Sequence, residues 1–222
     1  MVKYLAKSLW SKLVLAGDIY KNSYSGLYCQ GCETFMLEKD LVDGKCPNHL
    51  VAPELVTEEN YFFKLSKYSD QIKKLIETDE LRIYPGSRKN EMLGLLSDGL
   101  MDVSFSRPKS VLPHGIDVPG DNTQVMYVWC DALTNYITAL EGDKYAKYWP
   151  CDLHIIGKDI NRFHTVYWPA MLLSAEIPLP KEILIHSFIN APGGQKMSKS
   201  LGNVVDPFEV VEQYGLEPLR YY

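Results

Sequence analysis

The sequence predicts an α/β fold in which a parallel sheet is joined to a smaller part built of short strands and helices. In the second half of the 222-residue chain, short apolar strands are expected at 125–129, 153–157 and 183–188, and helical segments alternate with them. This order is typical of right-handed crossovers between parallel strands. In the first half, two pairs of potential metal ligands, at 29–32 and 46–49, interrupt a tyrosine-rich region with many turns.

The other elements are predicted from helical periodicity, capping residues and proline positions. A helix over 2–16 ends at Gly17-Asp18, and short strands and loops are expected around a metal over 19–62. Two further helices are expected at 66–78 and 87–96, followed by a region of strand and loops at 100–122. In the second half, helices are expected at 131–140, at 160–174 and from 207 onward.

The composition is that of an ordinary globular protein, with 46% hydrophobic residues, which argues against disorder. A formal net charge of −5 gives no broad electrostatic case for nucleic acid, so contact with RNA would depend on local patches. No stretch is long and apolar enough to span a membrane. Lys3, Lys7 and Lys12 interrupt the apolar residues of the first helix, unlike in a signal peptide. We therefore expect a cytoplasmic protein with no membrane partner.

Three cysteines and one histidine have the spacing of a zinc site. Cys29-x-x-Cys32 and Cys46-x-x-His49 can each form a tight turn that directs two ligands to one point. Four protein ligands leave no open position, so the zinc would be structural rather than catalytic. The alternatives are a redox Cys-x-x-Cys pair or unrelated surface thiols. A disulfide framework is the weaker interpretation, because the five cysteines are odd in number and no secretory signal is present.

A glycine- and serine-rich loop at 194–203 contains two lysines, Lys196 and Lys199, separated by Met197 and Ser198. Two ammonium groups, hydroxyls and backbone N–H groups in one loop suit a triphosphate whose charge changes during a reaction. A lone Lys-x-x-Lys would more simply be a solvated basic loop. The loop follows a predicted strand, and ligands of parallel α/β sheets bind at the carboxyl ends of strands. Two further strand ends carry the runs 129–131 and 157–159.

With these residues in view, the chain resembles the methionyl-tRNA synthetase family of class I aminoacyl-tRNA synthetases. The loop Lys-Met-Ser-Lys-Ser at 196–200 resembles the signature loop of the whole class. The order and spacing of the other motifs resemble the methionine family over nearly the whole length. These motifs are the two ligand pairs and the runs at 60–66, 128–136, 156–164 and 167–172.

The resemblance implies a methionine pocket formed by aromatic and apolar side chains. An unbranched, polarizable thioether packs well against aromatic rings, which supports this assignment. Tyr136 and His164 would add polar tips that orient the sulfur or exclude rivals. Each aromatic alone would more simply belong to an ordinary core. The implied pocket residues are Trp129, Ala132, Leu133, Tyr136, Ile160, Phe163, His164 and Trp168.

The resemblance also implies ATP, accompanied by Mg²⁺, as a substrate, together with methionine and tRNA(Met). Gly157 would allow close approach of the nucleotide, and Asp159 would accept hydrogen bonds from ribose or from the substrate amino group, or cap the helix that follows. Lys196, Ser198 and Lys199 would bind ATP, and the two lysines would stabilise charge as pyrophosphate leaves. The expected reaction is ATP-dependent activation of methionine and its transfer to tRNA for protein synthesis.

The expected organisation has three parts. Residues 1–20 are a helix from the end of an N-terminal catalytic half, residues 21–112 a zinc-binding connective domain, and residues 113–222 the second half of a Rossmann-like catalytic sheet. The family's His-x-Gly-His motif is absent from this sequence. We therefore expect that motif and the anticodon-binding domain to lie outside the chain, and the chain alone to be inactive. The alternatives are a non-catalytic zinc or tRNA-binding module, a subunit of a split synthetase paired with a separate N-terminal half, or another class I enzyme such as the leucine one.

Overall fold

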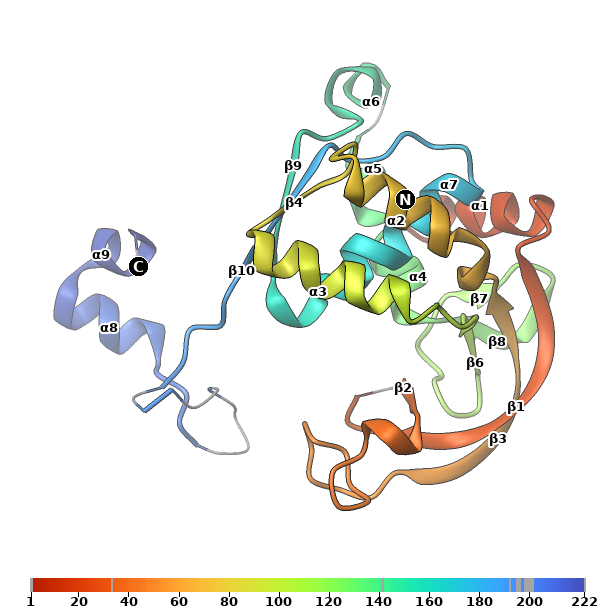
Figure 1. Ribbon diagram of the computed structural model, residues 1–222, viewed down its shortest axis with the longest axis horizontal. Helices are drawn as coiled ribbons and strands as arrows, with labels where there is room; N and C mark the ends of the chain where they lie inside the picture. The colour runs from red at the N-terminus through yellow and green to blue at the C-terminus, as the bar shows by residue number, and fades with distance from the viewer. Residues whose placement is uncertain are drawn as a thin grey trace.

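A three-stranded parallel sheet lies in the body of the molecule, in the order β4-β10-β9 (Figure 1). The structure, a computed structural model, describes residues 2–32, 34–140, 142–191, 193–194, 197 and 202–221. The strands are β4 (Arg82–Tyr84), β9 (Leu153–Gly157) and β10 (Glu182–His186). Ile183 of β10 lies between Ile83 and His154, and these three side chains face the core. The opposite face exposes Leu153 and Ile155, so only one face of this sheet is buried.

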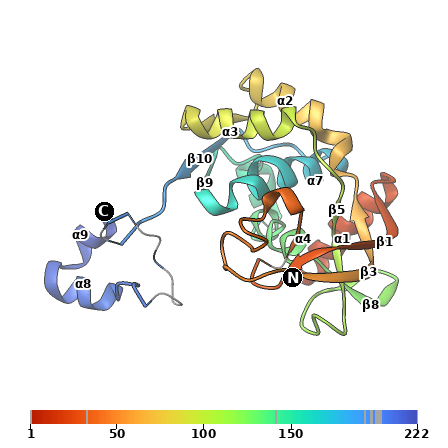
Figure 2. The same ribbon diagram turned by 60° about the horizontal axis from the view of Figure 1, so that its bottom comes forward.

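The core is closed by helices α1 (Val2–Leu15), α2 (Ser69–Glu77), α3 (Gly86–Ser97) and α7 (Trp168–Ser174). α2 follows the 3₁₀ turn η2 (Leu65–Tyr68) and runs beside α3 along one side of the body (Figure 2). α1 and α7 pack against each other and contribute Trp10 and Trp168, both fully buried. The predicted helices at 2–16, 66–78 and 87–96 are confirmed. Across the described residues, every helix is too short or too polar to cross a bilayer.

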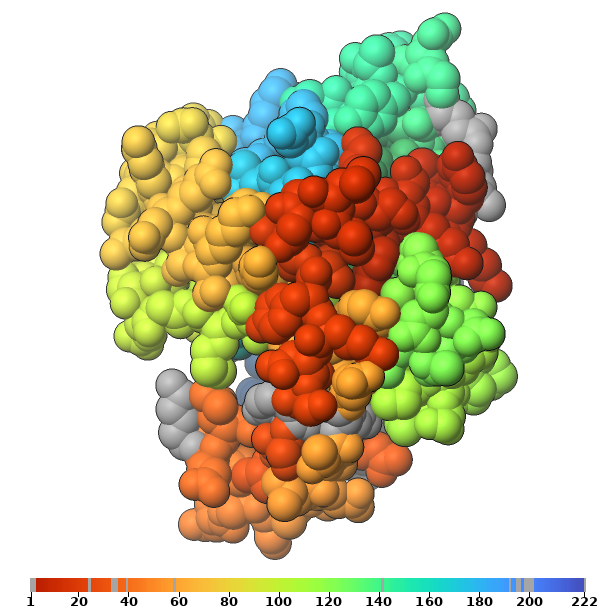
Figure 3. All heavy atoms as spheres, turned by 90° about the vertical axis from the view of Figure 1, so that its right-hand side faces the viewer, coloured from red at the N-terminus to blue at the C-terminus, as the bar shows by residue number. Residues whose placement is uncertain are grey.

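A long antiparallel ribbon carries the metal-ligand region away from the body. β1 (Ile19–Cys29) and β3 (Glu54–Phe63) pair from Ile19 opposite Phe63 out to Tyr28 opposite Glu54. β2 (Thr34–Met36) joins the far end of β1, β5 (Val103–Ser104) joins the base of β3, and the turn η1 (Glu38–Asp40) follows β2. The resulting lobe projects at the bottom of Figures 1 and 3. The prediction of only short strands over 19–62 was wrong. The serine, asparagine and glycine residues of β1 give the segment a low strand propensity, so its length could not be recognised from the sequence.

The predicted strand at 125–129 does not belong to the parallel sheet. A separate antiparallel sheet is formed by β6 (Ser106–Pro108), β8 (Asp121–Met126) and β7 (Asp117–Val118), in that order. Trp129 lies instead in helix α4 (Val128–Ala132). A short buried apolar run reveals neither the direction of its partner nor its sheet. The third parallel strand is β4, whose three residues are too few to give a periodic signal.

The helices of the second half are shorter and less regular than predicted. The segment 131–140 contains the end of α4 and the separate helix α5 (Asn135–Thr138), and α6 (Asp143–Tyr148) follows. The segment 158–174 begins with the 3₁₀ turn η3 (Lys158–Ile160), continues through a π-helical turn η4 (Phe163–Tyr167) and ends with α7. Pro169 has no N–H to donate to the preceding turn, which accounts for the local widening.

The last described helices are α8 (Pro207–Tyr214) and α9 (Leu216–Tyr221), which lie apart from the body in Figure 1. The Asp206 carboxylate accepts a hydrogen bond from the backbone N–H of Phe208 at 2.8 Å and so caps α8, which begins at 207 as predicted.

Candidate functional site

Two aromatic rings from separate elements stack at the amino-terminal end of α4. The rings of Trp129 and Phe163 are 4.0 Å apart and inclined by 9°. His164, the next residue of η4, meets Trp129 edge-on at 6.1 Å. The π-helical turn places Phe163 and His164 on the side of the helix that faces α4. Neighbouring residues of one short turn therefore contact the same tryptophan.

Tyr136 and His164 form a polar pair inside this aromatic cluster. The phenol oxygen of Tyr136 lies 2.7 Å from Nε2 of His164, and Nδ1 of His164 lies 3.0 Å from the carbonyl oxygen of Ile160. A carbonyl only accepts, so Nδ1 carries the hydrogen, Nε2 accepts, and Tyr136 donates. Burial lowers the pKa of His164, although the Ile160 contact opposes this, so the ring is neutral near pH 7. The pair therefore has a defined tautomer and direction.

The remaining predicted pocket residues surround these rings or lie next to them. Trp168 is fully buried and its ring lies 6.2 Å from that of Tyr136. Leu133 is buried, and Ile160 is partly buried and packs on the core. Ala132 ends α4 beside Leu133. The structure thus gathers the five predicted aromatics, Trp129, Tyr136, Phe163, His164 and Trp168, into one connected cluster.

A second group lies at the carboxyl ends of β9 and β10. A Cβ atom at Gly157 would lie 2.9 Å from Oδ1 of Asp159 and 3.7 Å from the ring of His186. Glycine is therefore required for this close approach. Asp159 lies within η3 and forms no cap there. His186 was not predicted as a site residue from the sequence, although its position near the end of a predicted strand indicated one.

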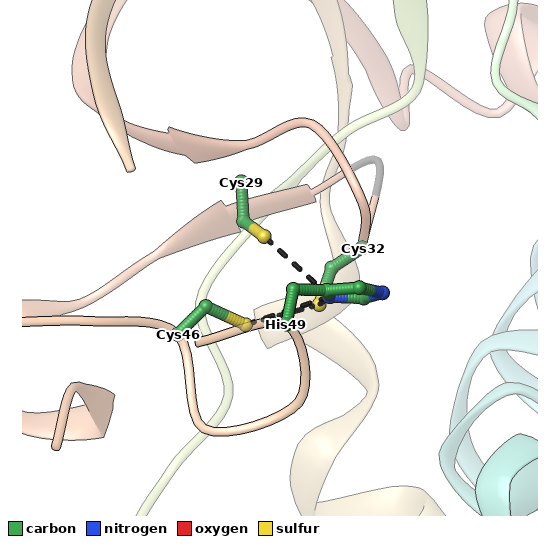
Figure 4. Close-up of side chains that lie close together, drawn as sticks. All are labelled: Cys29, Cys32, Cys46 and His49. Carbon is green, nitrogen blue, oxygen red and sulfur yellow. Dashed lines mark hydrogen bonds between the residues drawn. The ribbon is translucent and has the colours of Figure 1, made fainter. Parts of the chain in front are cut away.

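The predicted metal ligands converge at the far end of the β1–β3 ribbon (Figure 4). All four ligand atoms, from Cys29, Cys32, Cys46 and His49, lie within 4.8 Å of one another. Nδ1 of His49 lies 3.2, 3.7 and 3.8 Å from the sulfurs of Cys32, Cys46 and Cys29, and the sulfurs of Cys32 and Cys46 are 3.5 Å apart. Tetrahedral zinc with Zn–S bonds of about 2.3 Å separates its ligand atoms by roughly 3.5–3.8 Å. The four side chains fit that geometry.

The surroundings of the ligands favour metal binding. Burial raises the pKa of Cys46, but hydrogen bonds from His49 and from the backbone N–H groups of Asn48 and His49 outweigh it and lower the pKa to about 6. Burial, followed by the contact with Cys46, raises the pKa of Cys32 to about 12. The thiolate is the form that binds metal, so Cys46 is prepared as a ligand. Gly31 leaves room for the imidazole, because a Cβ there would lie 2.6 Å from the His49 ring.

The three residues predicted in the lysine loop, Lys196, Ser198 and Lys199, lie outside the described residues. Their geometry relative to Gly157 and Asp159 therefore rests on the sequence, which places the loop after β10. The carboxyl ends of β9 and β10 are adjacent in the sheet.

Comparison with known proteins finds one family over almost the whole chain. The model of the family described as "tRNA synthetases class I (M)" matches residues 2–52 and 49–222. A methionine–tRNA ligase of Caldanaerobacter subterraneus subsp. tengcongensis is 49% identical over 98% of this chain, which covers 34% of that relative. One of Clostridium acetobutylicum is 51% identical over 93% of the chain and 32% of the relative.

Solved structures agree. The Mycobacterium tuberculosis methionyl-tRNA synthetase bound by methionyl-adenylate has a TM-score of 0.90 and 42% identity over 99% of this chain. Its free form has a TM-score of 0.86 and 39% identity. This chain covers 44% of either structure. The chain thus spans about a third to under half of the length of the relatives it matches.

Proposed function

The chain belongs to the class I tRNA synthetases of the (M) group, and from this premise we propose that it supplies the methionine-binding part of a methionine–tRNA ligase. The observation that carries the proposal is the cluster of Trp129, Phe163, His164 and Tyr136. Stacked rings offer a polarizable surface that suits a thioether. The proposed pocket also includes Ala132, Leu133, Ile160 and Trp168.

The Tyr136–His164 pair would give this pocket its polar selectivity. His164 holds the phenol hydrogen, so the lone pairs of the Tyr136 oxygen point elsewhere. A substrate that merely fits the apolar space would gain packing but no matched polar contact. A hydrophobic pocket distinguishes two substrates that differ by one apolar group by only about 1–3 kcal/mol. An oriented polar group in the pocket therefore adds useful selectivity.

ATP, with Mg²⁺, is the proposed second substrate. Gly157 and Asp159 lie where parallel α/β sheets bind ligands, at the strand ends. Lys196, Ser198 and Lys199 would contact the triphosphate, and the two lysines would stabilise the charge that develops when the methionine carboxylate attacks the α-phosphate and pyrophosphate leaves. Transfer of the methionyl group to a terminal ribose hydroxyl of tRNA(Met) completes the proposed reaction. Positioning and charge stabilisation would provide the catalysis, in the cytoplasm.

Zinc is proposed as a structural cofactor held by Cys29, Cys32, Cys46 and His49, on the basis of the matching ligand distances. The lobe around these residues has few buried apolar side chains of its own, so a metal would supply much of its stability. We infer that residues 21–112 form the zinc-bearing insertion, with β4 returning to the sheet. Residues 1–20 and 113–222 would belong to the catalytic part.

A further protein segment is proposed to complete the sheet. Among the described residues, β9 pairs only with β10, and the sheet exposes Ile155 and Leu153 on one face. Parallel sheets are normally covered on both faces, and a free edge presents unpaired backbone groups. The N-terminal half of the family, in the same chain or as a separate one, would supply the missing strand.

The proposal can be tested in a chimera in which this chain replaces the matching segment of the Caldanaerobacter relative, to which it is 49% identical. Methionine-dependent ATP–pyrophosphate exchange and charging of tRNA(Met) should both be retained. Exchange supported by leucine but not by methionine would contradict the proposal. The unmodified relative serves as the control for assay conditions.

A further inference from the structure

The ring of Tyr136 also contacts a histidine outside the proposed pocket. The imidazole of His154, from β9, lies 4.2 Å from the Tyr136 ring, inclined by 55°. The same imidazole lies 6.0 Å from the ring of His164. His154 thus contacts both members of the polar pair, yet it comes from a different element than either.

His154 is itself held in place. Its side chain is only 5% exposed, and Nε2 lies 3.5 Å from the sulfur of Cys151. The ring of Trp149 lies 6.5 Å from that of His154. The indole N–H of Trp149 donates to the carbonyl of Pro178 at 3.0 Å, which holds the Trp149 ring in place beside His154. Burial, assisted by His164, lowers the pKa of His154 to about 4. A neutral, well-packed ring therefore faces Tyr136 at physiological pH.

A cavity beside these rings would allow Tyr136 to move if its contact with His154 were lost. Tyr136, Cys151 and His154 line one cavity of about 960 Å³ that opens to the surface. Without the imidazole, this cavity would extend along the Tyr136 ring. The phenol could then tilt toward it and leave Nε2 of His164 without a donor.

We propose that His154 is a positioning residue for methionine selection, which holds the Tyr136 ring so that its hydroxyl stays on His164. The inference rests on the proposed methionine pocket and extends it by one layer. His154 does not touch substrate; it acts through Tyr136. A strand of the parallel sheet thereby fixes the polar tip of a pocket whose other walls are helical.

Two variants separate the role of the ring from that of simple packing. His154→Leu fills similar space without an aromatic face, and His154→Phe restores the aromatic face. In nitrogen-15 NMR spectra of the 222-residue chain, His164 should show one neutral tautomer with hydrogen on Nδ1. The Leu variant should keep this tautomer, because Ile160 still accepts from Nδ1, but the Nε2 signal of His164 should move toward that of an imidazole nitrogen that accepts no hydrogen bond. The Phe variant should return the Nε2 signal to its wild-type position.

Kinetics in the chimera provide the second readout. Because an aromatic pair contributes about 0.5–1.5 kcal/mol, His154→Leu should raise the methionine KM roughly two- to twelvefold and leave the ATP KM unchanged. The preference for methionine over norleucine, in which CH₂ replaces sulfur, should fall by a similar factor. His154→Phe should recover most of both. His114→Ala, in an exposed loop, should match the wild type throughout.

The outcomes distinguish this inference from the proposed function. An unchanged Nε2 signal of His164 in the Leu variant, or equal increases in the KM for methionine and ATP, would overturn the role of His154 alone. A wild-type chimera that shows the single tautomer but no methionine binding would overturn the proposed function, and the selection role with it.

Discussion

The carboxylate of Asp18, at the end of α1, accepts a hydrogen bond from the hydroxyl of Ser174 at 2.7 Å, although 156 residues separate them in the chain. Lys67 donates to the same carboxylate at 2.7 Å, and the Tyr68 hydroxyl donates to it as well. Asp18 is only 1% exposed. One buried carboxylate therefore joins the segment after α1, the turn before α2, and α7, which carries Trp168 of the proposed pocket.

Replacing this carboxylate should destabilise the protein. Asp18→Asn leaves three donors without their charged acceptor, so the free energy of unfolding at pH 7 should fall by about 3 kcal/mol, as measured by urea unfolding. Asp152→Asn is the matched control. It removes a carboxylate paired with Lys181 at 2.6 Å on the surface, and exposed pairs contribute at most about 1 kcal/mol. Equal effects of the two variants would contradict the role of Asp18.

The same carboxylate predicts a pH dependence. Burial raises the pKa of Asp18, but hydrogen bonds from Lys67, Tyr68 and Ser174 outweigh it, and the pKa is lowered on folding. A carboxyl with a lowered pKa stabilises the fold above its unfolded pKa of about 3.9, and this stability is lost as the pH falls through the folded value. The difference in unfolding free energy between wild type and Asp18→Asn should therefore shrink below about pH 4. A constant difference from pH 7 to pH 3 would argue against this assignment.

Zinc binding should depend on Cys46. Protein purified without added metal should contain about one zinc per chain, measured by mass spectrometry of the metal. Cys46→Ser should abolish it and raise hydrogen exchange over 21–60 far more than in α7. Cys151→Ser, which removes a half-buried thiol outside the cluster, should retain the metal. Wild-type protein without zinc after such purification would contradict the proposed site.

Gly31 provides a sharper test of the same site. A Cβ at this position would lie 2.6 Å from the His49 ring, so Gly31→Ala should displace the imidazole. Zinc affinity, measured by competition with a chelator, should fall roughly 10- to 100-fold, the scale of a disturbed ligand orientation. Gly94→Ala, which meets no atom within 4 Å inside helix α3, should leave zinc affinity unchanged and stabilise that helix slightly.

Trp129 should contribute to methionine binding through packing. In the chimera, Trp129→Ala removes the ring stacked on Phe163 and should raise the methionine KM, a loss of roughly 2–4 kcal/mol at most. The ATP KM measured in the same assays is the internal control. If methionine binding is untouched, the pocket lies elsewhere.

The lysine loop should govern catalysis without being sufficient for it. We expect the 222 residues by themselves to show no ATP–pyrophosphate exchange, because the nucleotide must be clamped from both sides of the sheet. Addition of a separately made N-terminal part of a relative should restore some activity. In the chimera, Lys199→Ala should lower the exchange rate by roughly a hundredfold or more. Exchange by the isolated chain at the rate of an intact enzyme would refute this expectation.

Much of the site was predictable because its residues are close in sequence or follow strand ends. The Cys-x-x-Cys and Cys-x-x-His spacings determine local turns, so the four candidate metal ligands converge as predicted. The strands at 153–157 and 183–188 have enough isoleucines to be recognised, and the structure has them as β9 and β10. Family motifs identified Trp129 and His164 before their contact was visible.

Tertiary structure decided what depends on distant partners. The three residues of β4 are a strand only because β10 offers them hydrogen bonds. Val125 and Met126, which begin the predicted strand at 125–129, pair with β6 and β7 rather than with the parallel sheet. The contact of His154 with Tyr136 and the convergence on Asp18 join segments far apart in the chain. Periodicity reports which face of an element is buried, whereas the identity of the neighbour depends on how all the elements pack together. For this reason the sequence determined the family, the candidate metal ligands and the aromatic set, and the fold decided which side chains hold them in position.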